Sequence, residues 1–225
     1  MRAVACKVLV VCGSPVVASA NLLRRLAGEC DHVVAVDRGL DALLGARLSC
    51  DVYVGDADTV SEAGRALVDA AEDFEVERHD PYKDYTDLAL ALDSVRRRWT
   101  GAEVVATCAT GGRPDMALSV LGLLAGYEDA PIWIVEDKVV ARILHTGESW
   151  TIEDAEGKTF SIIAIAPNTD VSERGLEWEL DHSPLGLLAD TGISNIVRST
   201  AEIEVHTGTA IAYLLHQGSI RTVGE

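Results

Sequence analysis

Two pairs of aspartates have the spacing of a site that holds a metal ion and a phosphate. Asp56 and Asp58 are two residues apart and directly follow an apolar, strand-like run. In an extended segment, side chains at this spacing point to the same side. Asp84 and Asp87 stand at the start of an expected helix over 84–99, where a spacing of three residues places them on one face. Paired carboxylates suit Mg²⁺, which prefers oxygen ligands and keeps substrate phosphates in its shell.

The helix start also has a simpler interpretation. Aspartate is a common N-cap, so Asp84 or Asp87 could serve only to cap the helix. The free N–H groups and the positive dipole end favour a bound anion at the same place. Two carboxylates there therefore indicate either a cap or a divalent ion held between them and a phosphate. Asp-x-Asp is itself common in acidic turns, so the pairs alone leave both alternatives open.

A glycine-rich stretch, Gly111-Gly112-Arg113, offers a second phosphate-binding element. The glycines allow close approach of the backbone, and the Arg113 guanidinium can bind phosphate oxygens in a bidentate manner. An ordinary glycine-rich turn is the alternative. The sequence contains neither a P-loop motif nor the dinucleotide-binding glycine fingerprint, which argues against a P-loop kinase and against a dehydrogenase.

Composition restricts the partners and the compartment. The 225 residues include 36 acidic and 19 basic side chains, for a net charge of −17. Such a charge argues against binding to nucleic acid or to an anionic membrane, and it suits cationic ligands and metal-bound phosphates. The five cysteines are odd in number and form no CxxC pair, which predicts free thiols in a reducing, cytoplasmic compartment. No apolar run is long enough to span a membrane.

Strand-like and helix-like segments alternate over the first part of the chain. The expected strands are 4–11, 32–36, 51–54, 74–78, 103–109 and 132–135, and the expected helices are 19–27, 40–44, 61–71, 84–99 and 116–125. This alternation is typical of a parallel α/β sheet, in which ligands bind beyond the carboxyl ends of the strands. Asp37, the Asp56/Asp58 pair and Asp115 all follow expected strands. We therefore expect them to gather at one edge with the Asp84/Asp87 helix start.

The pattern changes after Glu136. Short strand-like runs follow at 139–145, 149–152, 158–166, 175–180, 200–206 and 210–215, separated by turn residues that include Ser183-Pro184. This pattern is typical of a small antiparallel β domain. The sequence thus predicts an α/β fold with an N-terminal three-layer, parallel-sheet domain over residues 1–140. A C-terminal antiparallel β-sandwich over residues 141–225 follows, with the boundary between Glu136 and Gly147.

Four stretches, in this order, resemble the motifs of the thiamine pyrophosphokinase family. They are Val54-Gly55-Asp56-Ala57-Asp58-Thr59, Lys83-Asp84-Tyr85-Thr86-Asp87-Leu88-Ala89-Leu90, Thr110-Gly111-Gly112-Arg113-Pro114-Asp115 and Gly192-Ile193-Ser194-Asn195. The similarity spans nearly the whole chain and includes Gly175-Leu176-Glu177-Trp178 in the β-rich part. Each motif alone is unspecific, whereas four in order with this spacing are specific.

The resemblance implies an enzyme that transfers a pyrophosphoryl group from ATP to the hydroxyethyl oxygen of thiamine and releases AMP. It further implies an α/β domain followed by a β-sandwich that binds thiamine, and a homodimer with its active sites between the subunits. The implied catalytic residues are Asp56, Asp58, Asp84 and Asp87, of which Asp56, Asp58 and Asp84 would hold Mg²⁺. The implied contacts to ATP and its phosphates are Asp37, Lys83, Thr86, Gly111, Gly112, Arg113 and Asp115. Ser194 and Asn195 would contact thiamine.

The chain also departs from the family pattern. Arg38 stands where the family has glycine, Ala57 where it usually has an aromatic residue, and Met116 where it often has histidine or glutamine. The aromatic residue that can stack on thiamine shortly after the Ser-Asn pair is not evident. These departures leave two alternatives: a pyrophosphokinase for another hydroxyalkyl heterocycle such as a pterin, or a module that binds nucleotide or thiamine without turnover. The retained aspartates argue against the second alternative.

Overall fold

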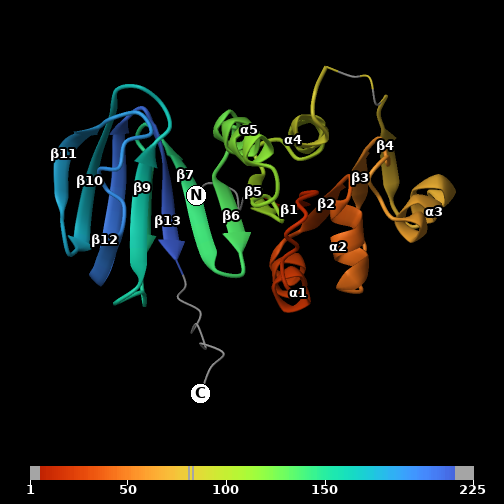
Figure 1. Cartoon of the computed structure of the whole chain (residues 1–225), viewed down its shortest axis with the longest axis horizontal. Coiled ribbons are helices and arrows are strands. Elements are labelled where there is room, and N and C mark those ends of the chain that lie inside the picture. Colours follow the sequence, from red (N-terminus) through yellow and green to blue (C-terminus); the bar gives the residue numbers. More distant parts are fainter. Residues whose placement is uncertain (1–5, 81, 83, 216–225) are drawn as a thin grey trace. The chain divides into compact units, whose positions relative to one another are not determined.

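The computed structural model describes residues 6–80, 82 and 84–215 (Figure 1). The chain divides into two compact units, residues 1–136 and residues 137–225. Within the described residues, no helix combines the length and apolar character needed to cross a membrane. The predicted free thiols are confirmed, since Cys6, Cys12, Cys30, Cys50 and Cys108 form no disulfide. Lys83, one of the residues expected to contact ATP, lies outside the described residues.

The first unit is a parallel sheet in the order β6-β5-β1-β2-β3-β4. Its strands are β1 (Lys7–Val11), β2 (His32–Val36), β3 (Val52–Gly55), β4 (Glu75–Arg78), β5 (Glu103–Thr107) and β6 (Ile132–Glu136). Its helices are α1 (Ala20–Glu29), α2 (Gly39–Gly45), α3 (Glu62–Ala70), α4 (Asp87–Arg98) and α5 (Pro114–Ala125). Helices α1 and α2 cover one face of the sheet, and α4 and α5 cover the other (Figure 1). The predicted three-layer parallel domain is thereby confirmed.

The central strands form because both of their faces are covered. Val8, Leu9, Val10 and Val11 of β1 are all 0% exposed, as expected for a strand between two helical layers. Strand β1 pairs with β2, the next strand in the chain, on one side and with β5 on the other. Such a reversal of strand order opens a crevice at the carboxyl ends of the two strands. The fold therefore places a natural binding site beyond β1 and β5.

Helix α4 begins later than the sequence predicted. Its N-cap is Thr86, whose hydroxyl accepts the main-chain N–H of Ala89 at 3.3 Å, and its first helical residue is Asp87. The expected start at Asp84 is wrong because the threonine hydroxyl supplies the cap and Thr86 itself is extended. Asp84 lies in a bend before the helix. It therefore does not share a helical turn with Asp87.

The second unit is built from antiparallel strands. They are β7 (Val139–His145), β8 (Ser149–Ile152), β9 (Thr159–Ala164), β10 (Thr169–Leu176), β11 (Leu180–Leu185), β12 (Asn195–Thr207) and β13 (Thr209–Leu215). One row runs β7-β13-β9-β12, and a second runs β8-β12-β10-β11. The long β12 belongs to both rows, because it pairs with β9 at its start and with β8 near its middle. This arrangement is the predicted β-sandwich.

Two sequence predictions in this unit are wrong. The expected strand over 175–180 contains the connection between β10 and β11, and the expected turn Ser183-Pro184 lies inside β11. The pattern misled because β10 buries polar side chains, namely Thr169, Ser172 and Glu173, so it lacks apolar alternation. Proline is tolerated in β11 because that strand lies at the end of the strand order.

Candidate active site

Three carboxylates meet at the ends of two neighbouring strands of the first unit. One oxygen each from Asp37, Asp56 and Asp58 lies within 4.8 Å of the others. Asp37 follows β2, whereas Asp56 and Asp58 follow β3, and the parallel register sets Val36 opposite Val54. The main-chain N–H of Asp37 donates to the Val54 carbonyl at 2.9 Å. The register therefore gathers the three carboxylates at the carboxyl edge of the sheet.

The local backbone is shaped to bring these side chains together. The main-chain N–H of Asp58 donates to Asp56 Oδ1 at 3.0 Å and closes a tight turn. Ala57, between them, is 1% exposed and has a φ of 64°. A Cβ atom on Gly55 would lie 3.1 Å from the Asp37 Cα, so a side chain there would push β3 slightly away from Asp37. Sequence and packing together fix the geometry of the carboxylate group.

The electrostatics of the group favour a bound cation. Burial raises the pKa of Asp37, the Thr59 hydroxyl opposes that rise by donating a hydrogen bond, and the negative charges of Asp87 and Asp56 reinforce it. The buried Tyr53 hydroxyl lies 3.4 Å from Asp37 Oδ1, and burial, followed by the charge of Asp37, raises the pKa of Tyr53. Crowded carboxylates disfavour one another's ionised form. A divalent cation would relieve that repulsion.

A cleft of about 490 Å³ adjoins the carboxylate group. Its lining comes from the loop after β1, the end of β2, the first turn of α4 and the β5–α5 connection, and includes Asp37, Thr59, Thr86, Asp87, Gly111, Arg113 and Met116. The cleft lies where the strand order reverses at β1 and β5. It thus brings together several residues that the sequence assigned to nucleotide and phosphate binding.

The glycine-rich loop forms one wall of the cleft. Gly111 and Gly112 have φ values of 96° and 73°, a region that favours glycine. A Cβ atom on Gly111 would lie 2.5 Å from a methyl carbon of Val16, and one on Gly112 would lie 2.5 Å from the Pro15 ring. The two loops beyond β1 and β5 can therefore pack together only because both positions are glycine.

Arg113 and Asp115 form an ion pair at the mouth of this loop. Arg113 Nε and Nη2 donate to the two Asp115 oxygens at 3.1 and 2.5 Å. Both side chains are exposed, and the hydrogen bond from Arg113 lowers the pKa of Asp115. Exposed ion pairs contribute little stability. The guanidinium can therefore exchange its carboxylate partner for a phosphate at small cost.

The Glu136 side chain, at the end of β6, holds the residues that lead into this glycine-rich loop. The sequence analysis did not identify Glu136 as a site residue. Its carboxylate accepts the main-chain N–H groups of Cys108, Ala109 and Thr110 at 3.2, 2.8 and 3.3 Å. Burial raises the pKa of Glu136, and these hydrogen bonds oppose the rise. An acidic residue at the end of an otherwise apolar strand was the available signal. Glu136 fixes the turn that leads from β5 into Gly111.

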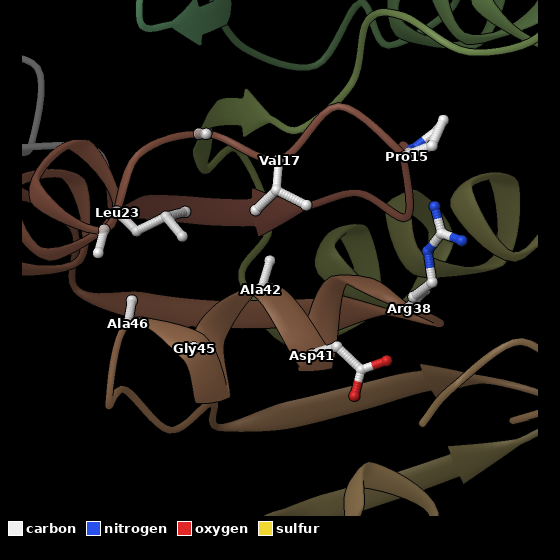
Figure 2. A pocket seen from close by; sticks show the side chains of 10 residues that line it. Pro15, Val17, Leu23, Arg38, Asp41, Ala42, Gly45 and Ala46 are labelled. Carbon is white, nitrogen blue, oxygen red and sulfur yellow. The ribbon is translucent and has the colours of Figure 1, made fainter. Parts of the chain in front are cut away.

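A second hollow, of about 510 Å³, lies between the loop after β1 and helix α2 (Figure 2). Arg38 and Pro15 stand together at one end, and Leu23 and Ala46 at the other (Figure 2). Arg38 and Pro15 also line the first cleft. Arg38, one of the departures from the family pattern, therefore stands at the rim shared by two hollows.

In the second unit, the predicted thiamine contacts Ser194 and Asn195 differ in exposure. Ser194 is exposed and has a φ of 59°. Asn195 is 3% exposed and holds the main chain of Trp178 from both sides, accepting its N–H at 3.1 Å and donating to its carbonyl at 2.7 Å. Trp178 is 61% exposed. Trp178 stands in a stretch that carried the family resemblance, but sequence reasoning gave it no role.

Both halves of the chain match family models. Residues 23–135 match "Thiamin pyrophosphokinase, catalytic domain" and residues 149–211 match "Thiamin pyrophosphokinase, vitamin B1 binding domain". The chain belongs to the thiamin pyrophosphokinase family. The resemblance seen in the sequence is thereby confirmed.

Named relatives and solved structures of this family agree. The chain is 27% identical to thiamine pyrophosphokinase 1 of Arabidopsis thaliana over 68% of its own length and 60% of the relative's. It is 26% identical to thiamine pyrophosphokinase 2 of the same plant, over 79% and 68%. The crystal structure of thiamin pyrophosphokinase from Geobacillus thermodenitrificans is similar with a TM-score of 0.76 and 27% identity, covering 94% of this chain and 98% of that one.

The carboxylate group differs in one member from the metal set that the resemblance to this family implied. Among the described residues, Asp37 joins Asp56 and Asp58, and Asp84 is not part of the group. Asp84 is exposed and is not among the residues that line either hollow. Its assignment as a metal ligand stays a prediction. Asp87 lines the cleft beside Thr86.

Proposed function

We propose that this chain catalyses Mg²⁺-dependent transfer of a pyrophosphoryl group from ATP to thiamine, giving thiamine pyrophosphate and AMP. The observation that carries the proposal is the convergence of Asp37, Asp56 and Asp58 beside a cleft whose other wall is a glycine-rich loop. The chain's membership of the thiamin pyrophosphokinase family names the reaction. Transfer of a phosphoryl-type group needs positioning and charge neutralisation more than covalent help.

The donor set of the carboxylate group fits Mg²⁺. Three carboxylate oxygens within 4.8 Å of one another provide hard ligands for a hard cation. We assign the ion to Asp37, Asp56 and Asp58, with Asp84 as a further predicted ligand. When bound, Mg²⁺ would neutralise phosphate charge and help to hold the reacting oxygens in line.

The other cleft residues would bind and orient the triphosphate. Gly111 and Gly112 leave their backbone close to the space that a phosphate would fill, and Arg113 would exchange Asp115 for phosphate oxygens. Thr86 keeps its hydroxyl as the cap of α4, so it would contribute through the helix end, where a dipole favours anions. Asp87, which lines the cleft, would orient the shell of the ion.

The acceptor contacts would come from the second unit. Thiamine carries a permanent positive charge, and an exposed indole such as Trp178 offers a π face for a cation. Asn195 fixes the backbone of Trp178, so its role would be to position that ring. Ser194, which is exposed, would contact thiamine directly. We propose that the complete site forms between the subunits of a homodimer.

The direct test is mass-spectrometric detection of products after incubation with thiamine, ATP and Mg²⁺. We expect thiamine pyrophosphate and AMP in equal amounts, and neither product when EDTA is added. A parallel panel of hydroxyalkyl heterocycles, including a hydroxymethyl pterin, tests the acceptor. If a different alcohol were consumed, thiamine would be the wrong acceptor. If Mg·ATP bound but no alcohol reacted, the chain would be a binding module.

A further inference from the structure

Two histidines and an aspartate come together on three adjacent strands of the second unit. The residues are Asp170 of β10, His182 of β11 and His206 of β12, and one ligand atom of each lies within 4.8 Å of the others. Asp170 lies opposite Pro184 of β11 and Thr207 of β12. The three strands lie side by side at one end of the unit (Figure 1). The cluster therefore bridges elements that are far apart in sequence.

The cluster lies on the face of the sheet that points away from the core. Val171 and Val205, the sequence neighbours of Asp170 and His206, are both 0% exposed. Because side chains alternate along a strand, the cluster residues project from the opposite face. His182 is 69% exposed at its side chain, against 26% for Asp170. An ion from solvent can therefore reach the site.

The His206 ring is held in place through its Nε2 atom. Its Nε2 lies 2.7 Å from the Ser172 hydroxyl, which also accepts the main-chain N–H of His182 at 3.1 Å. A ligating histidine commonly donates its second ring N–H to an oxygen in this way, which fixes the tautomer. In the tautomer that donates Nε2–H to Ser172, the lone pair on His206 Nδ1 is available to an ion. Glu204 Oε1 lies 3.6 Å from that Nδ1 and can take a further position.

Two further features call for a ligand at this place. The Asp170 Oδ1 atom is buried and has no hydrogen-bond partner among the described residues, whereas buried acceptors are nearly always paired. The His182 Nδ1 atom lies 3.4 Å from this oxygen. The His182 and His206 rings are stacked with centroids 3.8 Å apart, so their ring nitrogens lie side by side. Two imidazole rings beside a carboxylate oxygen that lacks a hydrogen bond offer the donor atoms that a metal ion needs.

We propose that Asp170, His182 and His206 form a binding site for a transition-metal ion of the Zn²⁺ class. Imidazole nitrogens suit Zn²⁺, Co²⁺ and Ni²⁺, whereas Mg²⁺ prefers an all-oxygen shell. Ligand atoms around Zn²⁺ lie about 3.3 Å apart, given bonds of about 2.0 Å in a tetrahedron. The exposed His182 side chain can rotate to close that distance. Three protein ligands leave one position open to water or to Glu204, and the ion would tie β10, β11 and β12 together.

Titration of the full chain with Co²⁺ tests the proposal. Excess Mg²⁺ is present to occupy the carboxylate group of the first unit, and binding is followed by the visible absorption of Co²⁺ and its loss on addition of Zn²⁺. We expect one equivalent to bind, with thermal unfolding shifted upward. His182→Ala should weaken binding at least about tenfold by removing one of three ligands. Because the His182 side chain is exposed, we expect this variant to fold like the parent chain. Circular dichroism checks that it does.

The matched control is His32→Ala, in β2 of the first unit. His32 also stands beside a carboxylate, with Nδ1 3.7 Å from Asp51 Oδ2, but it belongs to no group of three ligands among the described residues. This variant should bind Co²⁺ as the parent chain does. The proposal is overturned if Co²⁺ does not bind, or if a folded His182→Ala/His206→Ala chain binds it with unchanged affinity and spectrum. The cluster would then be only an Asp–His ion pair.

Discussion

At the scale of single residues, the surroundings of each acidic side chain decide what it can do. Asp56 and Asp58 stand at a sheet edge that solvent reaches, where their charges can be balanced by a cation. Glu173 is 0% exposed inside the second unit, and burial raises its pKa to about 7. Its Oε2 accepts from the Asn195 amide at 3.3 Å, while Oε1 has no hydrogen-bond partner among the described residues. A carboxylate at the sheet edge can therefore be neutralised by a bound cation. A buried carboxyl group such as Glu173 destabilises the fold when it ionises.

Asp56→Asn should lower kcat/KM by roughly 10²–10³, the range seen when one electrostatic contact to a transition state is lost. The fold should be retained, because removing one of three crowded carboxylates relieves repulsion. Steady-state assays at saturating Mg²⁺ measure the effect, and Asp73→Asn, at an exposed residue between α3 and β4, is the control. Turnover like that of the parent chain in Asp56→Asn would remove the proposed metal site.

Glu173→Gln should change how stability depends on pH. The folded pKa of about 7 exceeds the ordinary value of 4.5, so the stabilising contribution of Glu173 is complete below pH 4.5 and is lost as pH rises through 7. The full loss is on the order of 3 kcal/mol. Glutamine keeps an acceptor for Asn195 and cannot ionise, so the variant should gain stability relative to the parent between pH 5 and 8.

Urea unfolding at several pH values measures this difference. Glu202→Gln, at an exposed position of β12, provides the control and should show no comparable trend. A difference between Glu173→Gln and the parent chain that stays constant with pH would show that Glu173 is not ionising within the fold.

At the scale of elements, the sequence correctly predicted the helices and strands whose apolar pattern and terminal residues indicate the same boundaries. The strands of the first unit were found because their apolar runs are continuous and polar residues end them. The start of α4 was misplaced because Asp84, Thr86 and Asp87 are all plausible N-caps, and only the structure shows that Thr86 accepts the N–H of Ala89. The β10–β11 hairpin was missed because its buried polar residues erase the alternation that marks a strand.

The candidate site was likewise predictable only where local sequence signals determine it. The sequence could place Asp37, Asp56 and Asp58 together because parallel strands align their carboxyl ends. It could not reveal that Glu136 holds the turn before Gly111, or that Asn195 is buried against the backbone of Trp178. Both contacts join segments that are distant in the chain, and neither has a local signature.

Asn195→Ala should weaken the β10–β11 connection and, with it, acceptor binding. The variant removes the partners of the Trp178 N–H and carbonyl, which should lower the free energy of unfolding by about 1–3 kcal/mol. If Trp178 contacts thiamine, KM for thiamine should rise more than KM for ATP. Ser199→Ala, at an exposed residue of the same strand, is the control. Equal changes in both KM values would assign Asn195 a purely structural role.

At the scale of the whole molecule, the proposed chemistry is divided between two units. Asp37, Asp56, Asp58 and the glycine loop belong to the first unit, whereas Ser194, Asn195 and Trp178 belong to the second. A chain with a net charge of −17 suits the proposed cationic acceptor, and it favours a cation that would offset the charge of the proposed triphosphate. If the complete site forms between subunits, each site combines the first unit of one chain with the second unit of its partner.

Mixing two inactive chains tests this arrangement. One carries Asp56→Asn, and the other carries Trp178→Ala together with Ser194→Ala. When the two are co-expressed in equal amounts, half of the dimers are mixed, and each mixed dimer has one site with both halves intact. Activity should therefore recover to about a quarter of that of the parent chain, as random pairing in a two-fold dimer requires. Native mass spectrometry measures the mixed fraction. Mixed dimers without recovered activity would place the whole site within one chain, because each site would then always contain one damaged half.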